Sequence, residues 1–103
     1  MERIIYVYQS EVSYCLRIIP PEHEGQNVNV GCKGVGCNFP KNKLNAFADY
    51  VSDVFYNLSE ESSTLKIRNE KEPSDSLADF RPINPREMML IYASIELNKK
   101  RHP

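Results

Sequence analysis

The chain of 103 residues has no tryptophan, only four glycines and only three cysteines. It also lacks a long apolar run, because no stretch approaches the roughly 18 consecutive apolar residues that suggest a membrane-spanning helix. The first residues, "MERIIYVYQSEVSYC", do not place an apolar segment behind a basic start, as a secretory signal would. These absences predict a cytoplasmic protein that does not enter a membrane.

An excess of charge of one sign is lacking as well. The 13 Lys and Arg residues are balanced by 14 Asp and Glu residues, so the formal net charge is −1. The chain as a whole therefore attracts neither nucleic acid nor an anionic membrane strongly, and any basic patch must be local. The odd number of cysteines is unusual for a secreted disulfide scaffold. Length and composition predict one globular domain that spans residues 1–103.

The periodicity of the apolar residues predicts an α+β domain with the element order β-β-β-α-β-α. We expect a small two-layer domain, in which an antiparallel sheet of about four strands carries two helices on one face. Residues 69–83 are rich in charge, Pro and Ser, and we expect them to form a long connection of a kind that is often mobile or functional. Leu77 and Phe80 are expected to hold this connection to the body of the domain. The expected strands are residues 3–8, 12–19, 27–32 and 64–68, and the expected helices are residues 43–58 and 84 to about 100.

The two helices show different signals. In the first, apolar residues recur at spacings of three and four, with polar residues such as Asp49, Ser52 and Asp53 on the opposite side. The second begins with "NPRE", which places Asn84 at the N-cap, Pro85 at the first helical position and Glu87 at the third. The apolar residues of the first helix are Leu44, Phe47, Ala48, Val51, Val54, Phe55 and Leu58.

The stretch "VGCKGVGCNFPKN", residues 30–42, concentrates three glycines and two cysteines in seven positions. A structural zinc site needs a second pair of ligands beside Cys32 and Cys37, and the chain does not offer one. A catalytic cysteine needs a base, and the two histidines lie in a loop and at the tail. We therefore predict no metal, no cofactor and no enzymatic activity, and interpret the stretch as a tight connection between a strand and a helix.

An alternative interpretation of this stretch is an anion site. A glycine-rich turn before a helix can hold a phosphate on its backbone amides, and lysines add charge. On this hypothesis the protein binds nucleic acid or a nucleotide. The residues would be Gly31, Lys33, Gly34, Lys41 and Lys43.

The C-terminal helix is apolar on two sides. One side carries Met88, Ile91, Tyr92 and Ile95, and nearly opposite lie Met89, Leu90, Ala93 and Leu97. A small domain with one other helix has little material to cover both sides. We predict that the first side packs on the sheet and that Met89, Leu90, Ala93 and Leu97 bind a protein, with Leu90 and Leu97 the most exposed. A homodimer is the simplest form of this contact.

These features favour a small non-enzymatic protein-binding module. It would act as an inhibitor or adaptor by covering a partner's surface, as phage anti-defence proteins, antitoxins and immunity proteins do. Six tyrosines, a residue type enriched in interfaces, agree with this prediction.

Overall fold

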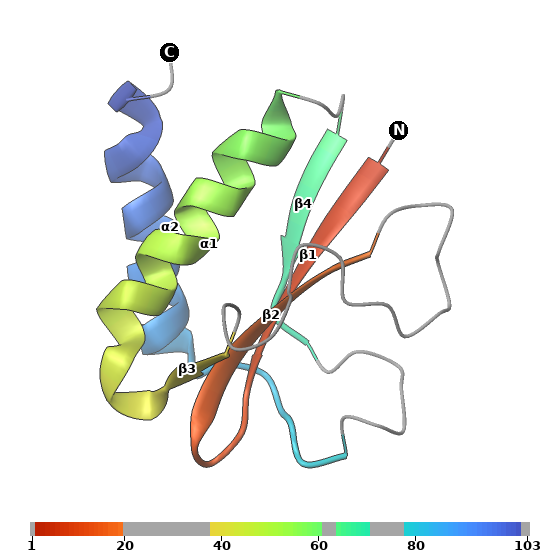
Figure 1. The fold of residues 1–103 in the computed structure, drawn as a ribbon, viewed down its shortest axis with the longest axis vertical. Coiled ribbons are helices and arrows are strands. Elements are labelled where there is room, and N and C mark those ends of the chain that lie inside the picture. The colour runs from red at the N-terminus through yellow and green to blue at the C-terminus, as the bar shows by residue number, and fades with distance from the viewer. Residues whose placement is uncertain (1, 20–37, 61–63, 71–77, 102–103) are drawn as a thin grey trace.

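The computed structural model describes residues 2–19, 38–60, 64–70 and 78–101. They form a four-stranded sheet and two helices in the predicted order β-β-β-α-β-α, which confirms the α+β class (Figure 1). Two short 3₁₀ turns, Lys41–Lys43 and Lys99–Arg101, lie before the first helix and after the second. The other elements are β1 (Glu2–Gln9), β2 (Ser13–Ile19), β3 (Asn38–Pro40), α1 (Leu44–Ser59), β4 (Thr64–Arg68) and α2 (Pro85–Asn98).

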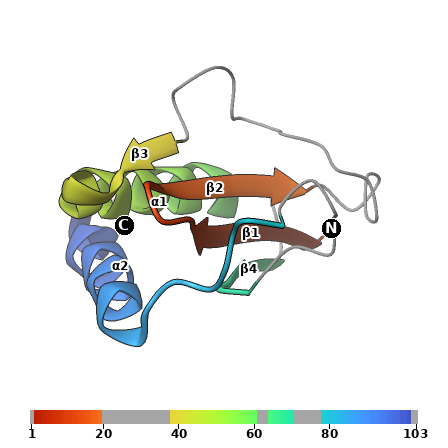
Figure 2. The same cartoon turned by 90° about the horizontal axis from the view of Figure 1, so that it is seen from below.

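The sheet has the strand order β3-β2-β1-β4, which can be followed in Figure 2. The pairs β1–β2 and β2–β3 are antiparallel, with Ile5 opposite Ile18 in the first. Strand β4 pairs with β1 in parallel, with Ile5 opposite Ile67, so the sheet is mixed. This corrects the expectation of an antiparallel sheet. The reason is topological, because α1 carries the chain back to the end of the sheet where β3 began, and β4 then runs in the direction of β3.

The third strand is only three residues long. The strand expected at 27–32 lies outside the described residues, whereas β3 falls in the stretch that was expected to be a connection. Its central residue, Phe39, packs against Phe47 and Tyr50 of α1, with ring centroids 5.6 and 5.4 Å apart. Three residues are too few to display an alternating pattern, so the tertiary contact of Phe39 defines this strand more than its sequence does.

The main core lies between the sheet and the two helices, which occupy the same side of it (Figure 1). The side chains that alternate inward on β1 and β2 meet the apolar faces of α1 and α2 there. Tyr14 of β2 stacks on Phe47 at 5.4 Å. The buried members are Ile5, Val7, Tyr14, Leu16, Ile18, Phe47, Ala48, Val51, Tyr56, Ile83, Met88, Ile91 and Ile95.

The opposite face of the sheet carries a smaller cluster. Tyr6, Tyr8 and Cys15 are buried there, with Ile4 and Phe80 packed against them. Phe80 comes from the connection that precedes α2, and its ring meets Tyr8 edge to face at 5.0 Å. The backbone of Arg81 forms a bridge to Gln9 through two hydrogen bonds of 2.9 and 2.8 Å. Residues 80 and 81 therefore belong to the body of the domain, and Figure 2 shows this segment leading to the first turn of α2.

Candidate protein-interaction surface on helix α2

Helix α2 begins where the sequence predicts. The Asn84 side chain accepts a hydrogen bond of 2.8 Å from the backbone N–H of Arg86, and Pro85 occupies the first turn. The helix ends at Asn98, and the 3₁₀ turn Lys99–Arg101 follows. The N-cap satisfies one of the orphan backbone donors that every helix start exposes. A local sequence signal therefore fixes the residue at which the helix starts, but it does not fix where the helix lies in the fold.

A polar cluster fixes the first turn of α2 against the sheet. The Tyr14 hydroxyl donates to Oε2 of Glu87 at 2.5 Å, and Nζ of Lys41 lies 3.9 Å from the same oxygen. Nζ of Lys41 also lies 4.3 Å from the centre of the Tyr14 ring and donates to the Gln9 side chain. Burial and the hydrogen bond and charge of the Glu87 carboxylate raise the pKa of Tyr14 far above its ordinary value. The hydroxyl therefore remains a donor at any physiological pH.

The residue before the helix cap is held separately. Ile83 is buried, its backbone N–H donates to Oδ1 of Asn69 at 2.5 Å, and its carbonyl accepts from Nδ2 of the same asparagine at 2.9 Å. The Gln9 side chain donates to the carbonyl of Pro82 at 2.8 Å. These bonds join β1 and the residue after β4 to the start of α2. They position the helix independently of its outward side chains.

The contact between α1 and α2 is partly polar. Nδ2 of Asn98 donates to the Ser52 hydroxyl at 2.9 Å, and that hydroxyl donates to the carbonyl of Ser94 at 3.3 Å. The Tyr56 hydroxyl donates to the carbonyl of Ile95 at 2.5 Å. Ser52 is fully buried, although the sequence placed it on the solvent side of α1. That expectation was wrong because α2 covers a second side of α1, where Asn98 satisfies the Ser52 hydroxyl.

The outward side of α2 remains apolar. Met89 is 71% exposed and Leu97 is 74% exposed, and Ala93 lies one helical turn from each of them and is also exposed. The structure thus brings three of the four predicted partner-binding residues onto one open stripe. The fourth, Leu90, is half-buried and packs against the core, whereas Tyr92, expected on the core side, is 48% exposed. Both lie at the borders between the two sides, where 100° spacing alone cannot decide burial.

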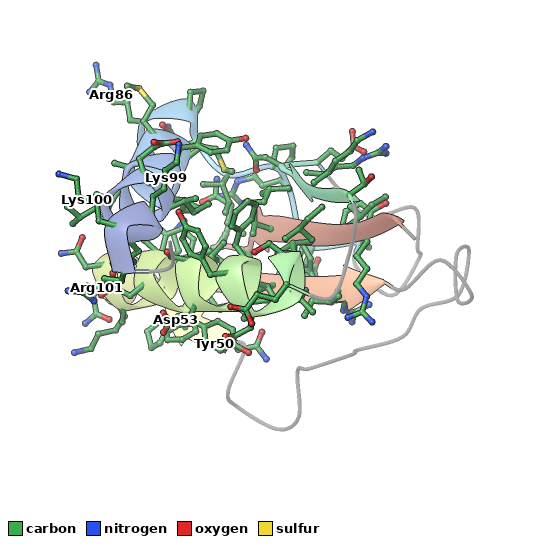
Figure 3. All side chains as sticks on the ribbon, turned by 90° about the horizontal axis from the view of Figure 1, so that it is seen from above. Tyr50, Asp53, Arg86, Lys99, Lys100 and Arg101 are labelled. Carbon is green, nitrogen blue, oxygen red and sulfur yellow. The ribbon has the colours of Figure 1, made fainter. Side chains whose placement is uncertain are left out.

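Charged residues border this stripe. Arg86 and Lys100 are exposed, and Figure 3 shows them projecting from the protein near the two ends of α2. Glu96 is exposed between them. The outward side of α2 therefore combines a central apolar stripe with two cations and one anion. We call Arg86, Met89, Ala93, Glu96 and Leu97 together the α2 stripe.

The alternative anion site is only partly within the described residues. Gly31, Lys33 and Gly34 lie outside them. Lys43 is exposed at the end of the first 3₁₀ turn, but Lys41 is half-buried in the cluster with Glu87 and Tyr14. An anion at Lys41 would have to compete with the Glu87 carboxylate. At Lys41 and Lys43, the two predicted positions that the structure describes, the geometry therefore does not favour an anion site, and the rest of the predicted site stays a prediction.

The polar cluster around Glu87 was not predicted from the sequence. Tyr14 and Glu87 are 73 positions apart, and no local pattern links residues at that separation. One signal was nevertheless present: Tyr14 alternates onto the inward face of a strand, and a buried tyrosine hydroxyl needs a hydrogen-bond partner. For Glu87, the sequence pattern indicates only a place in the first turn of the helix.

Among the described residues, no group of three or more His, Cys, Asp and Glu side chains is placed to hold a metal ion. Cys15 is buried, with Sγ 3.4 Å from the Tyr8 hydroxyl. An open hollow at the β1–β2 turn is lined by Ser10, Glu11, Val12, Ser13, Asp79, Phe80 and Arg81. Cys32, Cys37, His23 and His102 lie outside the described residues.

Comparison with known proteins adds no identification. No family model, no curated protein and no solved structure matches this chain. Neither α1 nor α2 is long and apolar enough to cross a membrane, and this holds for the described part of the chain. The function therefore has to be argued from the geometry of the protein itself.

Proposed function

We propose that the protein is a small, non-enzymatic protein-binding module that docks onto a partner through the outward side of α2. One observation carries this proposal. Four large hydrophobic side chains are strongly exposed among the described residues, and three of them, Met89, Tyr92 and Leu97, lie on this one helix. Exposed apolar side chains that are scattered singly are normal, whereas a group on one element marks an interaction site.

The way α2 is held supports the same proposal. Its start is bonded to Tyr14 of the sheet and, through Ile83, to Asn69 after β4, and its last turn is bonded to α1 through Asn98. A helix fixed at both ends presents its outward side chains with little conformational freedom left to lose on binding. The entropy cost of ordering these side chains on binding is then smaller, so more of the favourable contact energy remains as affinity. Full burial of a Met or Leu side chain contributes about 1.5–3 kcal/mol, so this surface can make a modest but specific contact.

The module would act as an inhibitor or adaptor that covers a functional surface of its partner. Phage anti-defence proteins, antitoxins and immunity proteins work in this way with chains of similar size. We place this action in the cytoplasm, in agreement with the buried Cys15 thiol and with the odd number of cysteines. The proposal requires neither a cofactor nor a metal.

The proposal is tested by placing a photo-crosslinking amino acid at position 93, in the centre of the outward side. A matched position is Asp53, which is exposed on α1 and labelled in Figure 3. In the cells that naturally contain the protein, illumination should give a discrete crosslinked product from position 93 and none from position 53. The product should disappear when Met89→Asp and Leu97→Asp are added. Equal products from both positions, or none from position 93, would refute the proposal.

A further inference from the structure

We infer that the occupant of this surface is a second copy of the same chain, with the two α2 helices antiparallel and their outward sides in contact around a two-fold axis that lies level with Ile91 along the helix. In this arrangement Met89 of each copy packs on Ala93 of the other, and Arg86 of each faces Glu96 of the other. The inference rests on the proposed function, because it uses the same side of α2, and it adds the identity of the partner and the register of the contact.

The spacing of the α2 stripe fits a helix pair. Arg86 and Ala93 are seven residues apart, and so are Met89 and Glu96. The four residues together follow one another along the exposed side at steps of three, four and three positions. This is the repeat that keeps one side of a helix facing another helix over several turns. All four residues are exposed, and Ala93 lies nearly opposite the buried side that contains Ile91 and Ile95.

The sizes of the central residues are self-complementary. A small Ala93 in the middle of an exposed side lets a second helix approach closely, and the flexible thioether side chain of Met89 can fill the space above it. In an antiparallel pair around a two-fold axis, Met89 opposite Ala93 requires Ala93 opposite Met89. One register therefore forms both central contacts, each of which pairs a large Met89 with a small Ala93.

The charges select the same register independently. The pair Met89–Ala93 and the pair Arg86–Glu96 are both centred on Ile91, so the register that matches sizes also brings opposite charges together at both ends. A parallel pair would place Arg86 beside Arg86 and Glu96 beside Glu96. An antiparallel pair centred on Ala93 would place Arg86 beside Lys100. Like charges that face each other are unfavourable, so among these three arrangements only the antiparallel pair centred at the level of Ile91 matches both the sizes and the charges.

The two charges cannot neutralise each other within one chain. They lie ten positions apart on the same helix, which corresponds to about 15 Å along its axis. Each is exposed on the free protein. A second copy would place an opposite charge in front of both residues at once, which a two-fold contact does by symmetry.

The expected dimer is weak. A stable interface buries roughly 800 Å² on each partner, and one helix of 14 residues, about 21 Å long, offers less than that. Association should therefore depend on concentration in the micromolar range or above. It should also weaken with added salt, because the end pairs are exposed to solvent.

The test is charge exchange, measured by sedimentation velocity over roughly 1 μM to 1 mM of the full chain. Arg86→Glu and Glu96→Arg should each weaken dimerisation by about tenfold or more, because each puts like charges face to face. The double variant should restore affinity to within about threefold of the original, since the opposite charges meet again with exchanged signs. Asp53→Arg on α1 makes the same change of charge as Glu96→Arg and should leave dimerisation unchanged.

Two results would overturn the inference: a chain that is monomeric at every concentration, or single variants that lose affinity without recovery in the double variant. Circular dichroism of each variant confirms that it is folded. The failure of this inference is distinguishable from that of the proposed function. A monomeric chain whose position 93 still crosslinks to a different protein refutes the second copy and leaves the binding module intact. A monomeric chain without any crosslinked product refutes both.

Discussion

Helices α1 and α2 have similar lengths and share one core, yet their solvent sides differ in chemistry. The exposed side of α1 carries Asn45, Asp49, Asp53 and Asn57. The exposed side of α2 carries Met89, Ala93 and Leu97 instead. A helix that is required only for folding gains solubility from polar residues on its outer side. The difference indicates that folding does not account for the outer residues of α2, and that α1 serves as the internal reference for every test of α2.

The largest expected effect is a difference in unfolding free energy between variants on the buried side of α2 and variants on its outward side. Ile91 is fully buried, so Ile91→Ala should lower the free energy of unfolding by about 2–5 kcal/mol through lost burial and a residual cavity. Leu97→Ala, on the outward side, should change it by less than about 0.5 kcal/mol. Urea unfolding followed by circular dichroism at low protein concentration measures both. Equal losses would mean that both sides of α2 are core, and the comparison with α1 would lose its basis.

The next effect concerns the polar contact between the helices. Asn98→Ala removes the donor to the buried Ser52 hydroxyl and should cost about 1–3 kcal/mol of unfolding free energy. Adding Ser52→Ala removes the other partner as well, so the double variant should lose less than the sum of the two single variants. Urea unfolding of the four proteins gives the coupling directly. Strict additivity would show that the hydrogen bond between α1 and α2 contributes no specific stability.

A smaller effect follows from the raised pKa of Tyr14. The folded pKa lies above the unfolded value of 10.0, so below pH 10 this group adds no pH dependence, and above it the unfolded state loses its proton first. Stability should therefore fall as pH rises above 10, by at most about 1.4 kcal/mol per pH unit from this group.

Tyr14→Phe removes that contribution, so its unfolding free energy should fall less steeply between roughly pH 10 and 11. Burial also raises the pKa values of Tyr50 and Tyr56, which contribute to the slope in the same direction. Thermal or urea unfolding in this pH window provides the measurement. Identical slopes for Tyr14→Phe and the original chain would contradict the docking of α2 through Glu87.

The smallest effect on stability is expected for the change that matters most for binding. Met89→Asp with Leu97→Asp should alter the unfolding free energy of the dilute chain by no more than about 1 kcal/mol, because both side chains are more than two-thirds exposed. The same protein should lose association and the crosslinked product. An unfolded double variant would place both residues in the core and remove the proposed surface.

The comparison of the helices also shows where local patterns were informative. The spacing in α1 identified its core-facing side, and "NPRE" identified the start of α2 at Asn84. Phe80 was expected to hold the long connection to the domain, and its ring packs on Tyr8. The other expected anchor, Leu77, lies outside the described residues.

The residues of the proposed binding surface were partly predictable for the same reason. Three of its residues, Met89, Ala93 and Leu97, follow from helical spacing once one side is known to face the core. Leu90 and Tyr92 do not, because each lies at a border of the helix. Contact with neighbouring elements decides there which side chain is covered.

The sequence alone determined the strands β1, β2 and β4, both helices and the two apolar sides of α2, because each depends on the order of neighbouring residues. Only the tertiary structure decided that β4 runs parallel to β1, that Ser52 is buried under α2, and that Lys41 and Tyr14 meet Glu87. These contacts join residues far apart in the chain, and their energy comes from packing and hydrogen bonds that no local pattern encodes. The α2 stripe depends on both. The spacing of its residues follows from the sequence, whereas their exposure depends on which side of α2 the rest of the fold leaves uncovered.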